Sequence, residues 1–130
     1  MANIGMKKVL RATYDEALAQ LPEALKTEGF GVLTEIDVKE TLKKKIDVDF
    51  RRYKIHGACN PALAHRALGS ELAVGVLLPC NVVVYEDDDG KAVVTAVDPM
   101  QTIGDQGGAE LREVAKLVKE KLGRVLERLV

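Results

Sequence analysis

The stretch NVVVYEDDDGKAVVTAV, residues 81–97, decides the fold. Two valine-rich runs, residues 81–86 and 91–97, flank an acidic tetrapeptide that ends in Gly90. Asp-Gly between two such runs predicts a β-hairpin, because both central residues of a tight hairpin turn must tolerate positive φ. The acidic run lacks the alternating spacing and the distal Glu of a calcium-binding loop, so it indicates a turn rather than a metal site. Two adjacent antiparallel strands are therefore expected here.

Three further strands and four helices are predicted around this hairpin. The strands are expected at residues 6–11, 31–37 and 53–59, and the helices at residues 13–29, 37–46, 60–68 and 109–130. The boundaries come from capping boxes (Thr13 with Glu16, Asp37 with Glu40), an N-cap with a proline after it (Asn60 and Pro61) and glycine stops (Gly29 and Gly69). Pro22 lies inside the first helical pattern and should bend that helix or shift its start. Loops are expected around Gly75 and over residues 101–108.

This order of elements predicts a single α+β domain over residues 1–130. It should hold a mainly antiparallel sheet of about five strands, with helices packed on one face. A chain of 130 residues with 47% apolar and 30% charged residues fits one soluble domain that needs no disulfide or metal to fold.

The overall charge gives no reason to expect a nucleic-acid or membrane partner. The formal net charge is -1, and the seven basic residues between positions 39 and 54 are diluted by acidic ones, which is typical of a solvated face. The N-terminus lacks the apolar core of a signal peptide, and the apolar stretch 72–84 is too short and interrupted to span a bilayer. Two cysteines make no disulfide framework, so a reducing, cytoplasmic location is expected.

The last helix carries an apolar stripe with coiled-coil-like spacing. Its members are Leu111, Ala115, Val118, Leu122, Val125 and Leu129, which step by four and three residues. Fewer than three heptads cannot hold an independent coiled coil, so the favoured interpretation is a helix that lies on the sheet. The alternative is a helix shared with a second subunit, and a homodimer is predicted.

The candidate functional site consists of two Cys-Asn pairs, Cys59-Asn60 and Cys80-Asn81, each beside a proline. Cys59 immediately precedes the predicted N-cap of a helix, where exposed amides favour a thiolate and can bind an anion. If strands 53–59 and 81–86 are antiparallel neighbours, both pairs meet at one end of the sheet. If they are parallel, the pairs lie at opposite ends and there is no common site.

Three interpretations of these pairs remain open. The first is a binding or interaction module with a small-ligand or anion site at Cys59, Asn60, Cys80 and Asn81. The alternative is a thiol-dependent redox or metal-binding protein that uses the two cysteines, although a metal site normally needs more ligands. The third is that the cysteines only pack in the core and the asparagines only cap backbone.

The chain carries no recognised catalytic motif, so it is not expected to be an enzyme, and neither a cofactor nor a metal is expected. In a regular strand His56 and Cys59 point to opposite faces, which argues against a His-Cys nucleophile pair. His65 is expected on the surface of its helix.

Three segments, residues 28–38, 57–61 and 77–85, resemble a prokaryotic family known as domain of unknown function 302. The resemblance runs from about residue 6 to 103. It implies an α+β fold with a curved antiparallel sheet, similar in outline to the TATA-binding-protein arrangement, and it implies dimers, which favours the shared helix. The family has no agreed activity, so the resemblance implies neither catalytic residues nor DNA binding.

Overall fold

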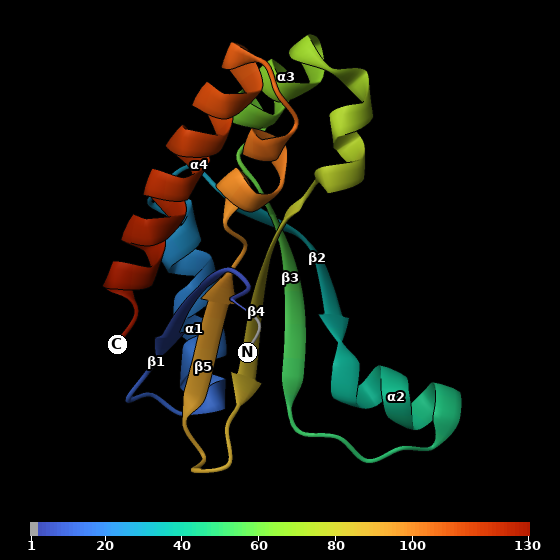
Figure 1. The fold of residues 1–130 in the computed structure, drawn as a ribbon. Helices are drawn as coiled ribbons and strands as arrows, with labels where there is room; N and C mark the ends of the chain where they lie inside the picture. Colours follow the sequence, from blue (N-terminus) through green and yellow to red (C-terminus); the bar gives the residue numbers. More distant parts are fainter. Residues whose placement is uncertain (1–2) are drawn as a thin grey trace.

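The computed structural model describes residues 3–130 as a five-stranded antiparallel sheet with four helices (Figure 1). The strands are β1 (Met6–Val9), β2 (Gly31–Asp37), β3 (Tyr53–Cys59), β4 (Cys80–Glu86) and β5 (Ala92–Ala96), in the spatial order β1-β5-β4-β3-β2. The α-helices are α1 (Tyr14–Lys26), α2 (Val38–Ile46), α3 (Pro61–Ser70) and α4 (Ala109–Arg128), and short 3₁₀ helices are η1 (Leu72–Leu77), η2 (Pro99–Gln101) and η3 (Ile103–Asp105). The predicted α+β class and antiparallel five-stranded sheet are confirmed.

The predicted helix starts are confirmed, and at α1, α2 and α3 a side chain next to the start satisfies a free amide. The Thr13 hydroxyl accepts from the amide of Glu16 at 3.2 Å, and the Glu16 carboxylate accepts from the amide of Thr13 at 3.0 Å. Asp37 accepts from the amide of Glu40 at 3.0 Å at the start of α2. Pro22 lies inside α1 without shifting the start of that helix from Tyr14.

Several predicted ends were wrong. α3 does not stop at Gly69, which lacks a positive φ, but continues to Ser70. The expected loops contain 3₁₀ turns, namely η1 around Gly75 and η3 within residues 101–108, while η2 ends at Gln101. β1 ends at Val9 rather than at residue 11, because the chain turns there toward α1.

The β4–β5 hairpin forms with a different turn from the predicted one. Only Gly90 in the turn has a positive φ, of 78°. The Asp87 carboxylate accepts from the amides of Asp89 and Lys91, at 3.0 and 2.9 Å. The side chain of Asp87 therefore adds to the backbone hydrogen bonds of this turn, which Asp87 forms with Lys91 and Gly90, and a second residue with positive φ is not needed.

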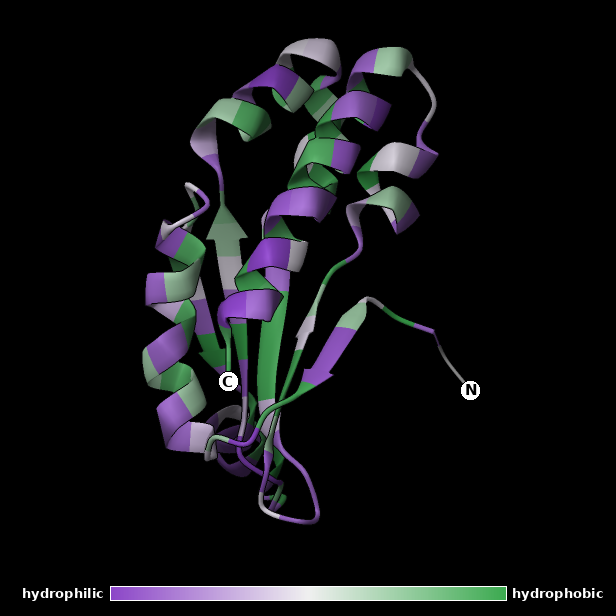
Figure 2. Cartoon of the chain, turned by 90° about the vertical axis from the view of Figure 1, so that its left-hand side faces the viewer, coloured by the Kyte–Doolittle hydropathy of each residue, from purple (hydrophilic) through white to green (hydrophobic). Residues whose placement is uncertain are grey.

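α1 and α4 cover one face of the sheet, as predicted (Figure 2), whereas α2 lies beside β2 and β3 and buries none of its residues. Cys80, Val82 and Val84 are buried on that face of β4, while Asn81 between them is exposed. α1 contacts β4 and β5, and α4 packs on α1, α3 and β5. The apolar residues that face inward from α4 are buried within this chain: Leu111, Val114, Ala115, Val118, Leu122, Val125 and Leu126. The stripe therefore lies against its own chain, which was the favoured prediction.

The other face of the sheet carries an apolar row that no helix covers within the described chain. This open face comprises Val9, Ile36, Tyr53, Ile55, Val83 and Tyr85, which alternate with the inward-facing residues of their strands. The Tyr53 and Tyr85 rings are stacked, with centroids 5.4 Å apart. Val9 and Ile36, at the two edges, are 50% and 48% exposed. None of these six side chains is charged.

Candidate functional site

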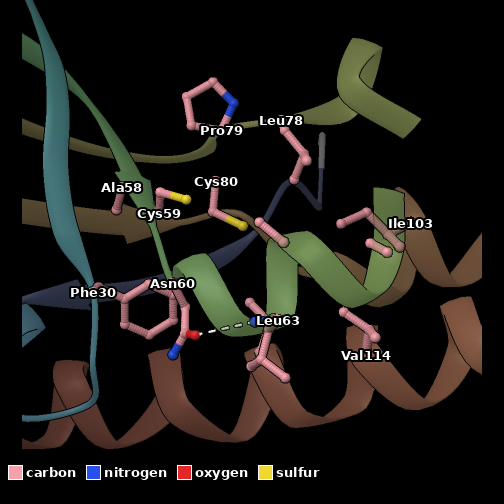
Figure 3. A pocket seen from close by; sticks show the side chains of 13 residues that line it. Phe30, Ala58, Cys59, Asn60, Leu63, Leu78, Pro79, Cys80, Ile103 and Val114 are labelled. Atoms are coloured by element: carbon pink, nitrogen blue, oxygen red, sulfur yellow. Dashed lines mark hydrogen bonds between the residues drawn. The ribbon is translucent and has the colours of Figure 1, made fainter. Parts of the chain in front are cut away.

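The two cysteines meet at one end of the sheet, because β3 and β4 are antiparallel and Ala58 lies opposite Cys80. Both line one narrow crevice, which Figure 3 shows from close by with the two sulfurs beside it. The rest of the lining is mainly apolar and consists of Phe30, Ala58, Asn60, Leu63, Ala64, Ala67, Leu78, Pro79, Ile103, Val114 and Val118. The cavity volume is about 20 Å³, which is room for a single water molecule rather than for a metabolite.

The two thiols have different environments. Cys80 is 7% exposed, whereas Cys59 is only half-buried. Burial raises the pKa of the Cys80 thiol to about 11, and the nearby Cys59 adds to the rise. Cys80 is therefore a protonated thiol at neutral pH, and it lines the same crevice as Cys59.

Asn60 is the N-cap of α3, as predicted, and both ends of its side-chain amide form a hydrogen bond to backbone. Its Oδ1 accepts from the amide of Leu63 at 3.3 Å, and its Nδ2 donates to the carbonyl of Glu28 at 3.2 Å. The second bond ties the start of α3 to the turn that follows α1, where Gly29 has a φ of 81°. The amide of Asn60 thus holds backbone together, with one of its two N–H donors bound to the Glu28 carbonyl.

Asn81 lies on the other side of the sheet. It is exposed, it lies opposite Gly57 of the neighbouring strand β3, and it does not line the crevice. Neighbouring residues of a strand point to opposite faces, so the burial of Cys80 turns Asn81 outward. The structure therefore brings together Cys59, Asn60 and Cys80, and leaves Asn81 apart from them.

The two histidines lie outside the crevice. His56 is only 1% exposed and points to the helix-covered face, with Nδ1 3.2 Å from the carbonyl of Val82 and Nε2 3.5 Å from a Glu35 carboxylate oxygen. Burial lowers the pKa of His56. His65 is exposed, as predicted. Within residues 3–130 no group of three or more His, Cys, Asp or Glu side chains is placed to hold a metal ion, and no helix is long and apolar enough to cross a membrane.

Sequence and structure comparisons place this chain in a known family. The model for the domain of unknown function DUF302 matches residues 6–129. No match to a curated protein was found. The chain is similar to the crystal structure of an uncharacterized conserved DUF302 protein from Bacillus stearothermophilus, with a TM-score of 0.90 and 33% identity over 99% of this chain and 100% of that one. The matched region covers nearly the whole chain, including the crevice and α4, and the chain belongs to the DUF302 family.

Proposed function

We propose that this protein acts through a dithiol formed by Cys59 and Cys80. The observation that carries the proposal is their position side by side on one crevice, one thiol half-buried and the other buried behind it. The small-ligand or anion interpretation of the same residues has less support, because the cavity holds one water and the Asn60 amide is engaged. We infer a cytoplasmic setting, where thiols are kept reduced and such a pair can cycle.

The proposed reaction is thiol–disulfide exchange with a low-molecular-weight disulfide. The Cys59 sulfur attacks the small disulfide, forms a mixed disulfide and releases one small thiol. Cys80 then loses its proton and attacks the Cys59 sulfur, which forms the protein disulfide and releases the second small thiol. The protein loses two electrons and two protons, and the small disulfide gains both. Cys59 attacks first because it is the cysteine that solvent can reach, and the buried Cys80 attacks in the second step.

We expect oxidised glutathione to convert the two thiols into one intramolecular disulfide, because the sulfurs share one crevice. Intact-mass measurement after alkylation should show two labels on the reduced protein and none after oxidation, with no mass from a second chain. The Cys80→Ser variant should stop at the mixed disulfide on Cys59, and Cys59→Ser should react slowly. Two thiols that stay unreactive until the protein is denatured would contradict the proposal and favour a purely packing role.

Zinc binding tests the metal-binding alternative. That alternative is favoured if the parent protein binds one zinc ion tightly and if both cysteine variants fail to bind it.

The open face of the sheet supports a second candidate function, an interaction module that assembles as a homodimer. A two-fold interface uses the same patch on both copies. The six open-face residues carry no charge, and Lys7 on the same face lies at the β1 edge, so the apolar rows of two copies can meet at the centre of the face. The α4 stripe is buried within its own chain and is not the proposed contact.

Light scattering on the intact protein at micromolar concentration should report twice the monomer mass. Because Val9 and Ile36 are exposed, lysine at either position can be tolerated by the monomer, and Val9→Lys and Ile36→Lys are expected to shift the mass toward the monomer. The control is Leu72→Lys, since Leu72 is 84% exposed and lies on η1, away from the open face. A stable monomer in the parent protein would overturn the dimer.

A further inference from the structure

A second cavity, of about 220 Å³, lies at the opposite end of β3 from the cysteines. It is lined by α1, by the β2–α2 junction and by the start of β3. Its residues are Tyr14, Asp15, Leu18, Asp37, Lys39, Arg52 and Lys54. Six of these seven side chains are polar, so this cavity differs in chemistry from the apolar crevice at Cys59 and Cys80.

One of the three cations in the cavity is fully engaged. Arg52 donates to Asp15 at 3.2 Å and to Glu86 at 2.6 Å, and its guanidinium lies 4.7 Å from the centre of the Tyr14 ring. Two nitrogens and one face of the guanidinium are thereby used, and the single charge of Arg52 lies between two carboxylates, Asp15 and Glu86. Arg52 fixes the Tyr14 ring in place rather than binding a ligand.

The remaining donors in the cavity have unused capacity. Lys54 forms no ion pair with any residue between 3 and 130. Lys39 donates once, to the carbonyl of Phe50 at 2.8 Å, and an ammonium has two further hydrogens. The Tyr14 hydroxyl has no hydrogen bond within the described chain, although the residue as a whole is buried. Burial, with the charge of Asp37, raises the pKa of Tyr14 to about 12, so the hydroxyl stays protonated and can donate.

Arg52, Lys39 and Lys54 together balance Asp15, Glu86 and Asp37, but Lys39 and Lys54 are the two cations of the cavity that form no ion pair within the described chain. One Asp37 oxygen is bound to the amide of Glu40, and its second oxygen can accept a further hydrogen bond. We propose that this cavity binds a small hydroxycarboxylate. Lys54 and the Tyr14 hydroxyl donate to its carboxylate, Lys39 adds a second ammonium, and Asp37 accepts from its hydroxyl.

A carboxylate fits these donors better than a phosphate does. Phosphate sites in proteins commonly add the forked guanidinium of Arg or a series of backbone amides to their lysines, and the Arg52 fork is already bound to two carboxylates. Two ammonium groups and one hydroxyl match the two oxygens of a carboxylate. The Asp37 carboxylate would repel a dianion more strongly than a monoanion.

The test is an NMR titration of the ¹⁵N-labelled full chain with L-lactate, with its uncharged analogue lactamide and with inorganic phosphate. Lactate should give saturable shifts at the amides around Tyr14, Lys39 and Lys54. Losing one charge-assisted hydrogen bond should weaken binding about tenfold or more in Lys54→Met. Tyr14→Phe keeps the ring beneath Arg52 and removes only the hydroxyl, so it should weaken binding with the fold intact.

Lys116→Met is the matched control, because Lys116 is exposed on α4 and does not line the cavity, and its binding should equal that of the parent. The proposal is overturned if lactamide titrates as well as lactate, or if Lys54→Met and Lys116→Met bind equally. Tighter binding of phosphate than of lactate would overturn the carboxylate assignment. The cysteine variants leave this cavity intact, so the result is independent of the dithiol.

Discussion

Replacing Leu122 by Ala is expected to lower the free energy of unfolding by about 2–5 kcal/mol. Leu122 is completely buried, near the middle of the α4 stripe, where it belongs to the same core as Leu21 and Leu25. The loss combines the transfer free energy of the removed carbons with the cavity left among neighbours that cannot fully relax. Denaturation in urea should show a lower midpoint with an unchanged slope, since the surface exposed on unfolding stays nearly the same.

The control for this substitution is Leu72→Ala, which removes the same atoms from a side chain that is 84% exposed. Its unfolding free energy should change by no more than about 0.5 kcal/mol. Because α4 packs on its own chain, the Leu122→Ala loss should be the same when the protein concentration is raised tenfold. A loss that grows with dilution would mean that α4 is shared between subunits, and a loss below about 1 kcal/mol would contradict its place in the core.

Much of the fold was predictable because its signals are local. The Thr13, Asp37 and Asn60 caps each act on amides two or three residues ahead, so a short window of sequence contains the whole interaction. The end of α3 was not predictable in this way. Gly69 permits a stop but does not force one, and the chain ends the helix only where Glu71 bonds to Ala67 and caps η1.

The candidate site was predictable only in part, because its geometry depends on long-range contacts. The sequence predicted that Cys59 and Cys80 meet on the condition that β3 and β4 are antiparallel, and the two strands are antiparallel. The separation of Asn81 from Cys80 could have been predicted, since successive strand residues face opposite sides. The engagement of Asn60 by the Glu28 carbonyl could not, because its partner lies thirty-two positions earlier in the chain.

The polar cavity gave no signal in the sequence. Tyr14, Lys39 and Lys54 belong to no motif, and Asp37 was recognised only as a helix cap. They share a cavity because β2 pairs with β3 in a register that sets Asp37 opposite Lys54, while α1 packs over that end of the sheet. The basic stretch at 39–54, taken from the sequence as a solvated face, contributes three of the lining residues.

The protein is expected to lose stability below about pH 6.5 because of His56. Burial lowers the pKa of this histidine in the folded state, Lys54 lowers it further, and Glu35 and the Val82 carbonyl act in the opposite direction. The unfolded chain, with an ordinary histidine pKa, therefore binds a proton at a higher pH than the folded chain does. Stability is fully present above pH 6.5 and falls as the pH drops toward the folded pKa, with a slope of at most about 1.4 kcal/mol per pH unit from this one group.

The contribution of His56 is isolated by comparing slopes rather than absolute stabilities, since carboxylates titrate in the same acid range. Urea unfolding between pH 7.5 and 5 should show a shallower pH dependence for His56→Gln than for the parent. His65→Gln, at an exposed position, should leave the slope unchanged. Glu35→Gln removes a group that raises the His56 pKa, so the folded-state pKa should fall further. The loss of stability should then begin at the same pH as in the parent and continue to a lower pH. Equal slopes for the parent and His56→Gln would mean that His56 can be protonated where it lies, with the Glu35 carboxylate 3.5 Å away compensating for its burial.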